Sequence, residues 1–193
     1  NEPISPAKKR EPGSWLSGEL GGYHFIQYIS LDRKDRPRHE IARQWISTLR
    51  DAIREEDPDG LVTVGLLPWT EKWGHLSGFV PKEVAPELDF MSVHKYPESG
   101  KVDLAIQIIK RFAVGKPLVI EETFPLSCSI AELEEFLLAS RKYATGWMGH
   151  YWGWTIEEYN ELAENNELTM QQAIFRQWLR LFRDLRPEMI GKG

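Results

Sequence analysis

Polar and aromatic side chains follow three apolar segments of the chain, each just before a turn. His94 and Tyr96 end the run LDFMSVHKYP, Glu121 and Glu122 end KPLVIEETFP, and His150 lies near the end of GWMGHYWGW. Carboxylates, imidazoles and phenols transfer protons and stabilise developing charge. These residue types therefore indicate acid–base or nucleophilic chemistry, provided that the fold brings the three segments together.

The elements that must position these residues alternate along the chain. Four segments have the composition of strands, at 61–67, 88–97, 116–125 and 146–154. Apolar residues at helical spacing predict a helix from Pro37 to about residue 57, one over 102–113, one after Ser129 and a last one around 174–185, with a short helix near 81–87. Ser129 and Glu132 have the spacing of a capping box. Residues 1–36 and the polar stretch after residue 154 are predicted to be loops.

This alternation of strand and helix predicts an α/β fold with a parallel sheet covered by helices. A doubly wound sheet and part of a (β/α)8 barrel both fit the pattern. The segment GELGG does not follow a strand, so no phosphate-binding loop favours the doubly wound alternative.

The carboxyl ends of parallel strands meet at one edge of a sheet, and barrel enzymes build their active sites there. We therefore expect the three strand ends to form one polar opening, with Asn1 and Glu2 as a fourth contribution. Strict alternation along a strand places Glu121 and Glu122 on opposite faces, so that only one points into the opening. The pattern leaves open which of the two does so.

Composition limits the classes of function. The 193 residues suit one domain, 1–193, and the net charge of −5 argues against nucleic acid as a partner. No apolar run approaches the roughly 20 residues of a membrane span. Five histidines without a metal-binding spacing predict no metal site, and nothing in the sequence indicates a cofactor. Eight tryptophans favour a ligand with a flat, partly apolar face.

Four segments in order, NEP, DFMSVHKYP, KPLVIEETF and YWGW, resemble successive landmarks of clan A glycoside hydrolases, most closely family 5, the cellulase and mannanase family. The resemblance implies the C-terminal half of a (β/α)8 TIM barrel, from the end of strand four through helix eight. It also implies a retaining glycosidase that cleaves β-glycosidic bonds in oligo- or polysaccharides, in the manner of an endo-β-glucanase or β-mannanase. The alternative is a barrel-derived protein that binds carbohydrate without cleaving it.

Carried over residue by residue, the resemblance makes Glu2 the acid/base and Glu122 the nucleophile. It makes Asn1, His94 and Tyr96 substrate-binding or supporting residues. The family usually has a small residue before the nucleophile, where this chain has Glu121, and an aromatic-Gly pair after it, where this chain has Thr-Phe-Pro.

The positions of the tryptophans separate those that could bind sugar from those expected in the core. The resemblance makes Trp152 the platform under the reacting sugar, with Trp154 as the alternative. Trp15, Trp69 and Trp73 lie in predicted loops and are candidates for more distant platforms. Trp45 and Trp178 lie on apolar helix stripes and are predicted to be core residues.

The resemblance further implies that strands one to three of the barrel are not part of these 193 residues. Open strand edges would then expose unpaired backbone groups. We expect the isolated chain to fold weakly, to associate with itself through the open barrel edges, or both, and to hydrolyse no substrate above background.

Overall fold

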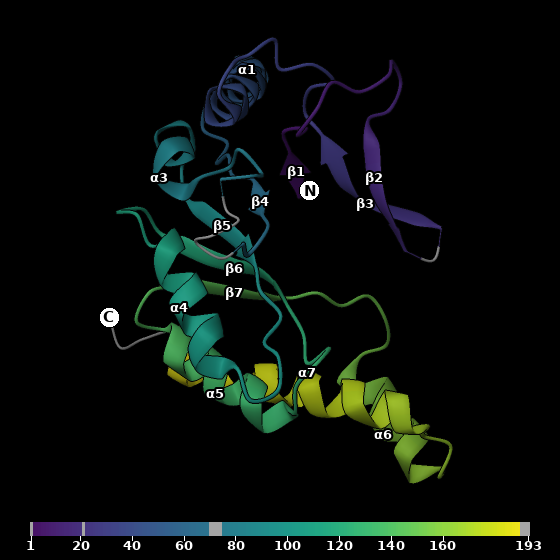
Figure 1. Ribbon diagram of the computed structural model, residues 1–193. Coiled ribbons are helices and arrows are strands. Elements are labelled where there is room, and N and C mark those ends of the chain that lie inside the picture. Colours follow the sequence, from purple (N-terminus) through teal and green to yellow (C-terminus); the bar gives the residue numbers. More distant parts are fainter. Residues whose placement is uncertain (1, 21, 70–74, 190–193) are drawn as a thin grey trace.

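The computed structural model describes residues 2–20, 22–69 and 75–189, and two sheets lie within this part of the chain (Figure 1). The larger sheet has the strand order β4-β5-β6-β7, with every neighbouring pair parallel. Its strands are β4 (Gly65–Leu66), β5 (Met91–His94), β6 (Leu118–Thr123) and β7 (Gly146–Gly149). Because all four run the same way, their carboxyl ends lie along one edge.

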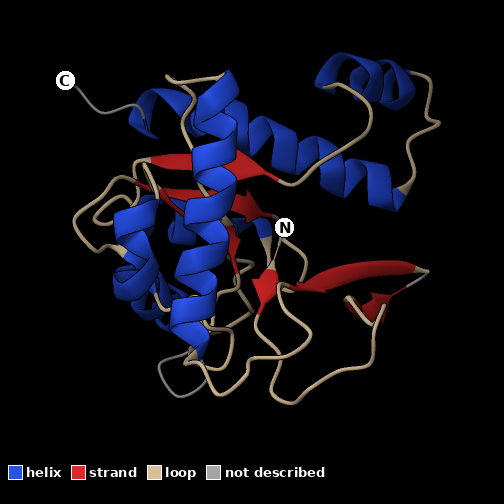
Figure 2. Cartoon of the chain, turned by 90° about the horizontal axis from the view of Figure 1, so that it is seen from above, coloured by secondary structure: helices blue, strands red, loops and turns tan. Residues whose placement is uncertain are grey.

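Helices precede, connect and follow these strands, and most of them cover one face of the sheet, with α6 beyond its edge (Figures 1 and 2). In chain order they are α1 (Arg38–Glu56), α3 (Pro81–Val84) with the 3₁₀ turn η1 (Ala85–Glu87), α4 (Val102–Phe112), α5 (Ile130–Ser140), α6 (Ile156–Glu164) and α7 (Met170–Met189). The core lies between this helical layer and the sheet. Its fully buried members include Val93 and Ile120 from the strands and Ile109, Leu133 and Trp178 from the helices.

The predicted α/β architecture is therefore confirmed, and so is the start of α5. The Ser129 side chain accepts a hydrogen bond from the Glu132 backbone, and the Glu132 carboxylate accepts one from the Ser129 backbone. This reciprocal pair satisfies two backbone donors that the first turn of a helix leaves without partners.

The prediction of a loop over residues 1–36 was wrong. Strands β2 (Leu16–Leu20) and β3 (Tyr23–Tyr28) form an antiparallel hairpin, and β1 (Pro3–Ile4) pairs with β3 in parallel. Gly22 has a φ of 85°, in the left-handed region that tight hairpin turns require. Gly22, the last residue of GELGG, is thus a turn signal. In Figure 1 the hairpin projects away from the parallel sheet.

Two predicted strands are shorter than expected. Within 61–67 only Gly65–Leu66 is strand. Earlier in the segment, the Val62 backbone N–H donates to the Asp89 carboxylate, and the Asp89 backbone N–H donates to the Val62 carbonyl. Strand β7 ends at Gly149 rather than near residue 154. Beyond it, the Tyr151 hydroxyl donates to the Trp154 carbonyl, and the chain bends at Gly153.

The polar stretch after residue 154 is helical in part, against our expectation. Helix α6 begins after Thr155, which forms a second capping box with Glu158. A Thr followed three residues later by Glu is the sequence signal for such a start. Among the described residues, none of the helices combines the length and the apolar character that crossing a membrane requires.

Candidate active site

Strand β6 brings both of its glutamates to the same histidine. Glu121 Oε2 lies 3.5 Å from His94 Nε2, and Glu122 Oε2 lies 3.5 Å from His94 Nδ1. The prediction that the two carboxylates point to opposite faces was therefore wrong. The register of β6 against β7 shifts between Ile120 and Thr123, and such an irregularity breaks the alternation and re-aims the side chains next to it.

The end of β5 supplies the centre of the site. The His94 side chain is 1% exposed, so both ring nitrogens face protein groups. Ser92 and Tyr96, two positions before and after His94, have hydroxyl groups that donate to the two glutamates. The Tyr96 hydroxyl donates to Glu122 Oε2 at 2.7 Å, and the Ser92 hydroxyl donates to Glu121 Oε2.

Glu2 reaches the site from the first described residues. Its backbone N–H donates to the Gly65 carbonyl at 3.2 Å, which fixes it against the edge of β4. Its φ of 47° lies in the left-handed region, which is uncommon for a residue with a side chain and recurs at functional sites. In this conformation Glu2 Oε1 lies 2.9 Å from His94 Nδ1.

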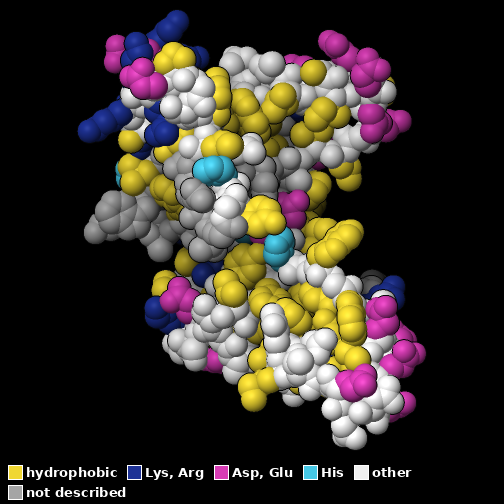
Figure 3. Space-filling view, turned by 90° about the vertical axis from the view of Figure 1, so that its right-hand side faces the viewer, with side chains coloured by type: hydrophobic (Ala, Val, Ile, Leu, Met, Phe, Trp, Pro, Cys, Tyr) yellow, Lys and Arg dark blue, Asp and Glu magenta, His cyan; other side chains and the backbone are white. Residues whose placement is uncertain are grey.

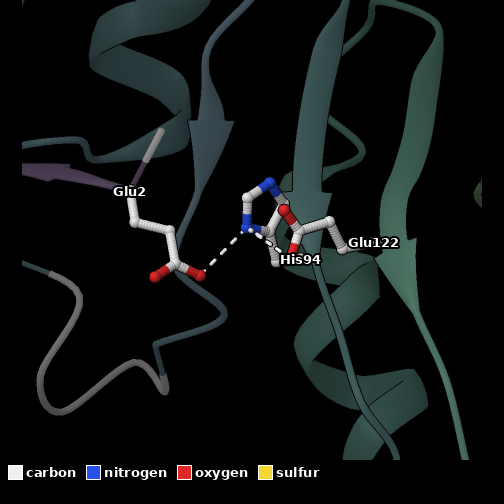
Figure 4. Close-up of side chains that lie close together, drawn as sticks. All are labelled: Glu2, His94 and Glu122. Atoms are coloured by element: carbon white, nitrogen blue, oxygen red, sulfur yellow. Dashed lines mark hydrogen bonds and ion pairs between the residues drawn. The ribbon is translucent and has the colours of Figure 1, made fainter. Parts of the chain in front are cut away.

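Figure 4 shows Glu2 and Glu122 approaching His94 from two sides. One carboxylate oxygen of Glu2, one of Glu122 and a ring nitrogen of His94 all lie within 4.8 Å of one another. The two carboxylates therefore converge on the same side chain from different parts of the chain.

The surroundings of His94 favour its charged form. Burial alone would lower the pKa of the imidazole. The hydrogen bonds to Glu121 and Glu2 and the negative charge of Glu122 outweigh burial and raise the pKa of His94 to about 9. At neutral pH both ring nitrogens therefore carry hydrogen and can donate to carboxylates.

Two neighbours of His94 have shifted pKa values of their own. The hydrogen bond from His94 lowers the pKa of Glu121, burial opposes this, and the Ser92 hydroxyl adds to the lowering. Burial, followed by the hydrogen bond to Glu122, raises the pKa of Tyr96. Glu121 is therefore held as a carboxylate, and Tyr96 keeps its proton and acts as a donor.

A cavity of about 610 Å³ is lined by Glu121 and Glu122, whereas Glu2 and His94 do not line it. Strands β6 and β7, the segment leading into β4, and helix α1 contribute its lining, which includes Glu121, Glu122, Met148, His150 and Trp152. His150 Nδ1 lies 3.6 Å from Glu122 Oε1. On the face drawn in Figure 3, acidic and histidine side chains lie at the waist of the molecule with hydrophobic side chains around them.

The predicted sugar-binding residues do not all reach this cavity. Trp152 lines it and its side chain is fully exposed, as a stacking platform would be. Trp154 instead stacks on Tyr159 of α6 and lines a separate hollow there. Trp69 is half-buried outside the cavity lining, with its carbonyl accepting a hydrogen bond from Arg111. Asn1 and Trp73 lie outside the described residues.

Three residues of the site were not chosen from the sequence. His150 was visible as part of a polar strand end, and its proximity to Glu122 depends on where β7 stops. Ser92 gave no signal, because a serine in an apolar strand resembles a tolerated core residue. Trp45 packs edge-on against Phe79 as a core residue would, yet it also lines the cavity.

Carboxylates and an imidazole at this spacing also raise the question of a cation. The Glu2, His94 and Glu122 group has the separation that a metal ion could bridge. The bond between Glu2 and His94 and the donation from Tyr96 to Glu122 account for the grouping without an ion. We interpret it as a hydrogen-bonded acid–base cluster.

Comparison with known proteins identifies the fold but no family. No family model matches the chain, and no curated protein matches it either. Among solved structures, it is similar to the exo-beta-1,4-mannosidase Op5Man5 from Opitutaceae bacterium strain TAV5, with a TM-score of 0.56 and 19% sequence identity. The match covers 78% of this chain and 32% of that protein, so the chain spans about a third of its length. The likeness confirms the fold, part of a (β/α)8 barrel with parallel strands and outer helices.

Proposed function

We propose that this chain carries the paired carboxylates of a retaining glycoside hydrolase that cleaves β-glycosidic bonds. The observation that carries the proposal is the convergence of Glu2 and Glu122 on His94, with oxygens within 4.8 Å. A double-displacement mechanism needs two carboxylates that reach one sugar ring together. The fold likeness to a solved structure named as an exo-beta-1,4-mannosidase supports the same class.

The hydrogen bonds favour one assignment of the two roles. Tyr96 donates to Glu122, and His94 and His150 lie within 3.6 Å of its oxygens. The hydrogen bond from Tyr96 orients the Glu122 carboxylate, and we assign Glu122 as the nucleophile that attacks the anomeric carbon. Glu2 is then the acid/base.

The reaction follows in two balanced steps. In the first, Glu122 forms a bond to the anomeric carbon while Glu2 gives its proton to the departing glycosidic oxygen. In the second, Glu2 takes a proton from water, the water oxygen bonds to the anomeric carbon, and Glu122 leaves as a carboxylate. The configuration of the sugar is retained.

For the substrate, we propose β-linked mannose or glucose polymers and their oligosaccharides. Trp152 beside the cavity offers an exposed indole face on which a pyranose can stack. The mannosidase neighbour makes β-1,4-mannosides the first substrates to test. The cavity volume of about 610 Å³ lies within the usual range of small-molecule sites.

The test is trapping of the covalent intermediate. The protein is incubated with a 2-deoxy-2-fluoro-β-mannosyl or β-glucosyl fluoride, digested, and mapped by mass spectrometry. We expect the sugar on Glu122, and no adduct in an E122Q variant. An adduct on Glu121 would overturn the assignment of the nucleophile. Sugar binding without any adduct or product would favour the alternative of a carbohydrate-binding protein.

A further inference from the structure

We propose that Glu121 is a positioning residue that holds His94, through the Nε2 side of the ring, in the orientation that presents Nδ1 to Glu2 and Glu122. The inference rests on the proposed function for its catalytic consequence. It concerns a residue to which the resemblance assigns no role, at a position where the family usually has a small side chain.

The geometry gives Glu121 and Glu122 different tasks. Glu121 Oε2 faces Nε2 of His94 at 3.5 Å, whereas Glu2 and Glu122 face Nδ1 at 2.9 and 3.5 Å. The two nitrogens flank the Cε1 carbon of the rigid imidazole ring and point in different directions. A carboxylate on one side therefore fixes how the other side is presented.

Glu121 is itself held in place. The Ser92 hydroxyl donates to Glu121 Oε2, the same oxygen that faces His94. The Ser92 side chain is fully buried, whereas 34% of the Glu121 side chain is exposed to solvent. The chain Ser92, Glu121, His94, Glu2 thus runs from the interior of the sheet to the proposed acid/base.

The charges around the imidazole explain why a second anion is useful there. Three carboxylates face His94 itself, those of Glu2, Glu121 and Glu122. Two further titratable groups, Tyr96 and His150, face Glu122. Glu121 is the one carboxylate of the three to which the proposed reaction gives no bond to make or break. It can balance the charge of His94 throughout the cycle, while Glu2 and Glu122 change theirs.

The test combines a measurement on His94 itself with kinetics. The variants are Glu121→Gln, which keeps the shape and removes the charge, and Ser92→Ala, which removes the support of Glu121. Glu134→Gln, on the exposed surface of α5, is the matched control. The pKa of His94 is followed by NMR of ring-labelled protein, and kcat and KM are measured across pH with an aryl β-glycoside.

In Glu121→Gln we expect the pKa of His94 to fall by about one unit or more, because its Nε2 partner loses its charge. We expect kcat to fall by about 10- to 100-fold, with KM changed by less than about twofold, since a small misplacement of catalytic groups already costs this much. Ser92→Ala should shift both in the same direction by less, and Glu134→Gln should shift neither.

The His94 measurement separates this inference from the proposed function. If the pKa of His94 falls in Glu121→Gln while the unchanged protein hydrolyses no glycoside, the positioning role stands and the proposed glycosidase activity is wrong. An unchanged His94 pKa in folded Glu121→Gln and Ser92→Ala would overturn the positioning role, whatever the activity. A raised KM with an unchanged His94 pKa would make Glu121 a substrate contact, and a trapped sugar on Glu121 would make it the nucleophile.

Discussion

His94 Nδ1 lies 2.9 Å from Glu2 Oε1, although 92 positions separate the two residues in the chain. Strand β5 carries one partner, and the other is anchored to the edge of β4 by its backbone. The contact therefore exists only when β4 and β5 are paired. It makes the proposed acid/base dependent on the packing of the sheet and gives the site several measurable properties.

Removing either carboxylate should reduce hydrolysis in a different way. In Glu2→Gln we expect kcat for a poor leaving group to fall by about 10²- to 10⁴-fold, the usual contribution of a proton donor. For an aryl glycoside whose leaving group needs no proton, the first step should persist and the covalent intermediate should accumulate. Glu122→Gln should abolish turnover of both substrates.

Steady-state and burst kinetics with two aryl glycosides of differing leaving-group acidity measure this contrast. Glu98→Gln, whose carboxylate pairs with Lys101 on the surface, is the control. Equal losses on both substrates in Glu2→Gln would contradict the acid/base role.

The Tyr96 hydroxyl should matter through Glu122. A hydrogen bond to a charged group contributes about 1.5–3 kcal/mol, so Tyr96→Phe should lower kcat by about 10- to 100-fold. The aromatic ring remains, and the unfolding temperature should change little. Kinetics together with thermal unfolding check this, and a Tyr96→Phe variant with wild-type kcat would remove Tyr96 from the site.

The raised pKa of His94 predicts how stability depends on pH. The folded protein holds the proton with a pKa of about 9, against the ordinary 6.5, so the stabilisation is fully present below pH 6.5 and is lost as the pH rises to about 9. We expect the free energy of unfolding to fall over this range by on the order of 3 kcal/mol.

Urea unfolding at a series of pH values measures the slope. In His94→Gln the fall between pH 6.5 and 9 should disappear, because the group that titrates is gone. A slope that is the same in both proteins would assign the effect to other residues.

Gly149, at the end of β7, should not tolerate a side chain. A Cβ at this position would lie 2.7 Å from Trp178 Cζ2. Gly149→Ala should therefore destabilise the protein by about 1–3 kcal/mol and displace the adjoining His150. In a double-mutant cycle with Trp178→Phe, the combined loss should be smaller than the sum of the single losses. If the two losses of stability simply add, the Gly149→Ala side chain does not clash with Trp178, which would contradict this prediction.

The edge of the parallel sheet at β7 predicts self-association of the 193-residue chain. Met148 on this strand is 55% exposed, and an exposed strand edge offers backbone groups to another chain. Light scattering at increasing protein concentration should show a rising mass. Met148→Lys should reduce it without lowering the unfolding temperature. A monomer at all concentrations would contradict this prediction.

The sequence by itself determined the local features of this protein. Apolar runs and helical spacing predicted a parallel α/β sheet, and Ser129 with Glu132 marked the start of α5, because these signals act between residues close in the chain. The order of polar strand ends also predicted that His94, Tyr96 and one of the two glutamates, Glu121 or Glu122, gather at one edge, since parallel strands end on the same side.

Tertiary structure decided what depends on register and on contacts between distant segments. The shift in β6 sends both Glu121 and Glu122 to His94, which strict alternation forbids. Strand β7 ends at Gly149, and the His150 backbone N–H still donates to the Thr123 carbonyl of β6, which places His150 Nδ1 3.6 Å from Glu122. Trp154 stacks instead on Tyr159 of α6. A bulge and a strand end are set by pairing with neighbouring strands and by packing, and neither is encoded in the few residues around it.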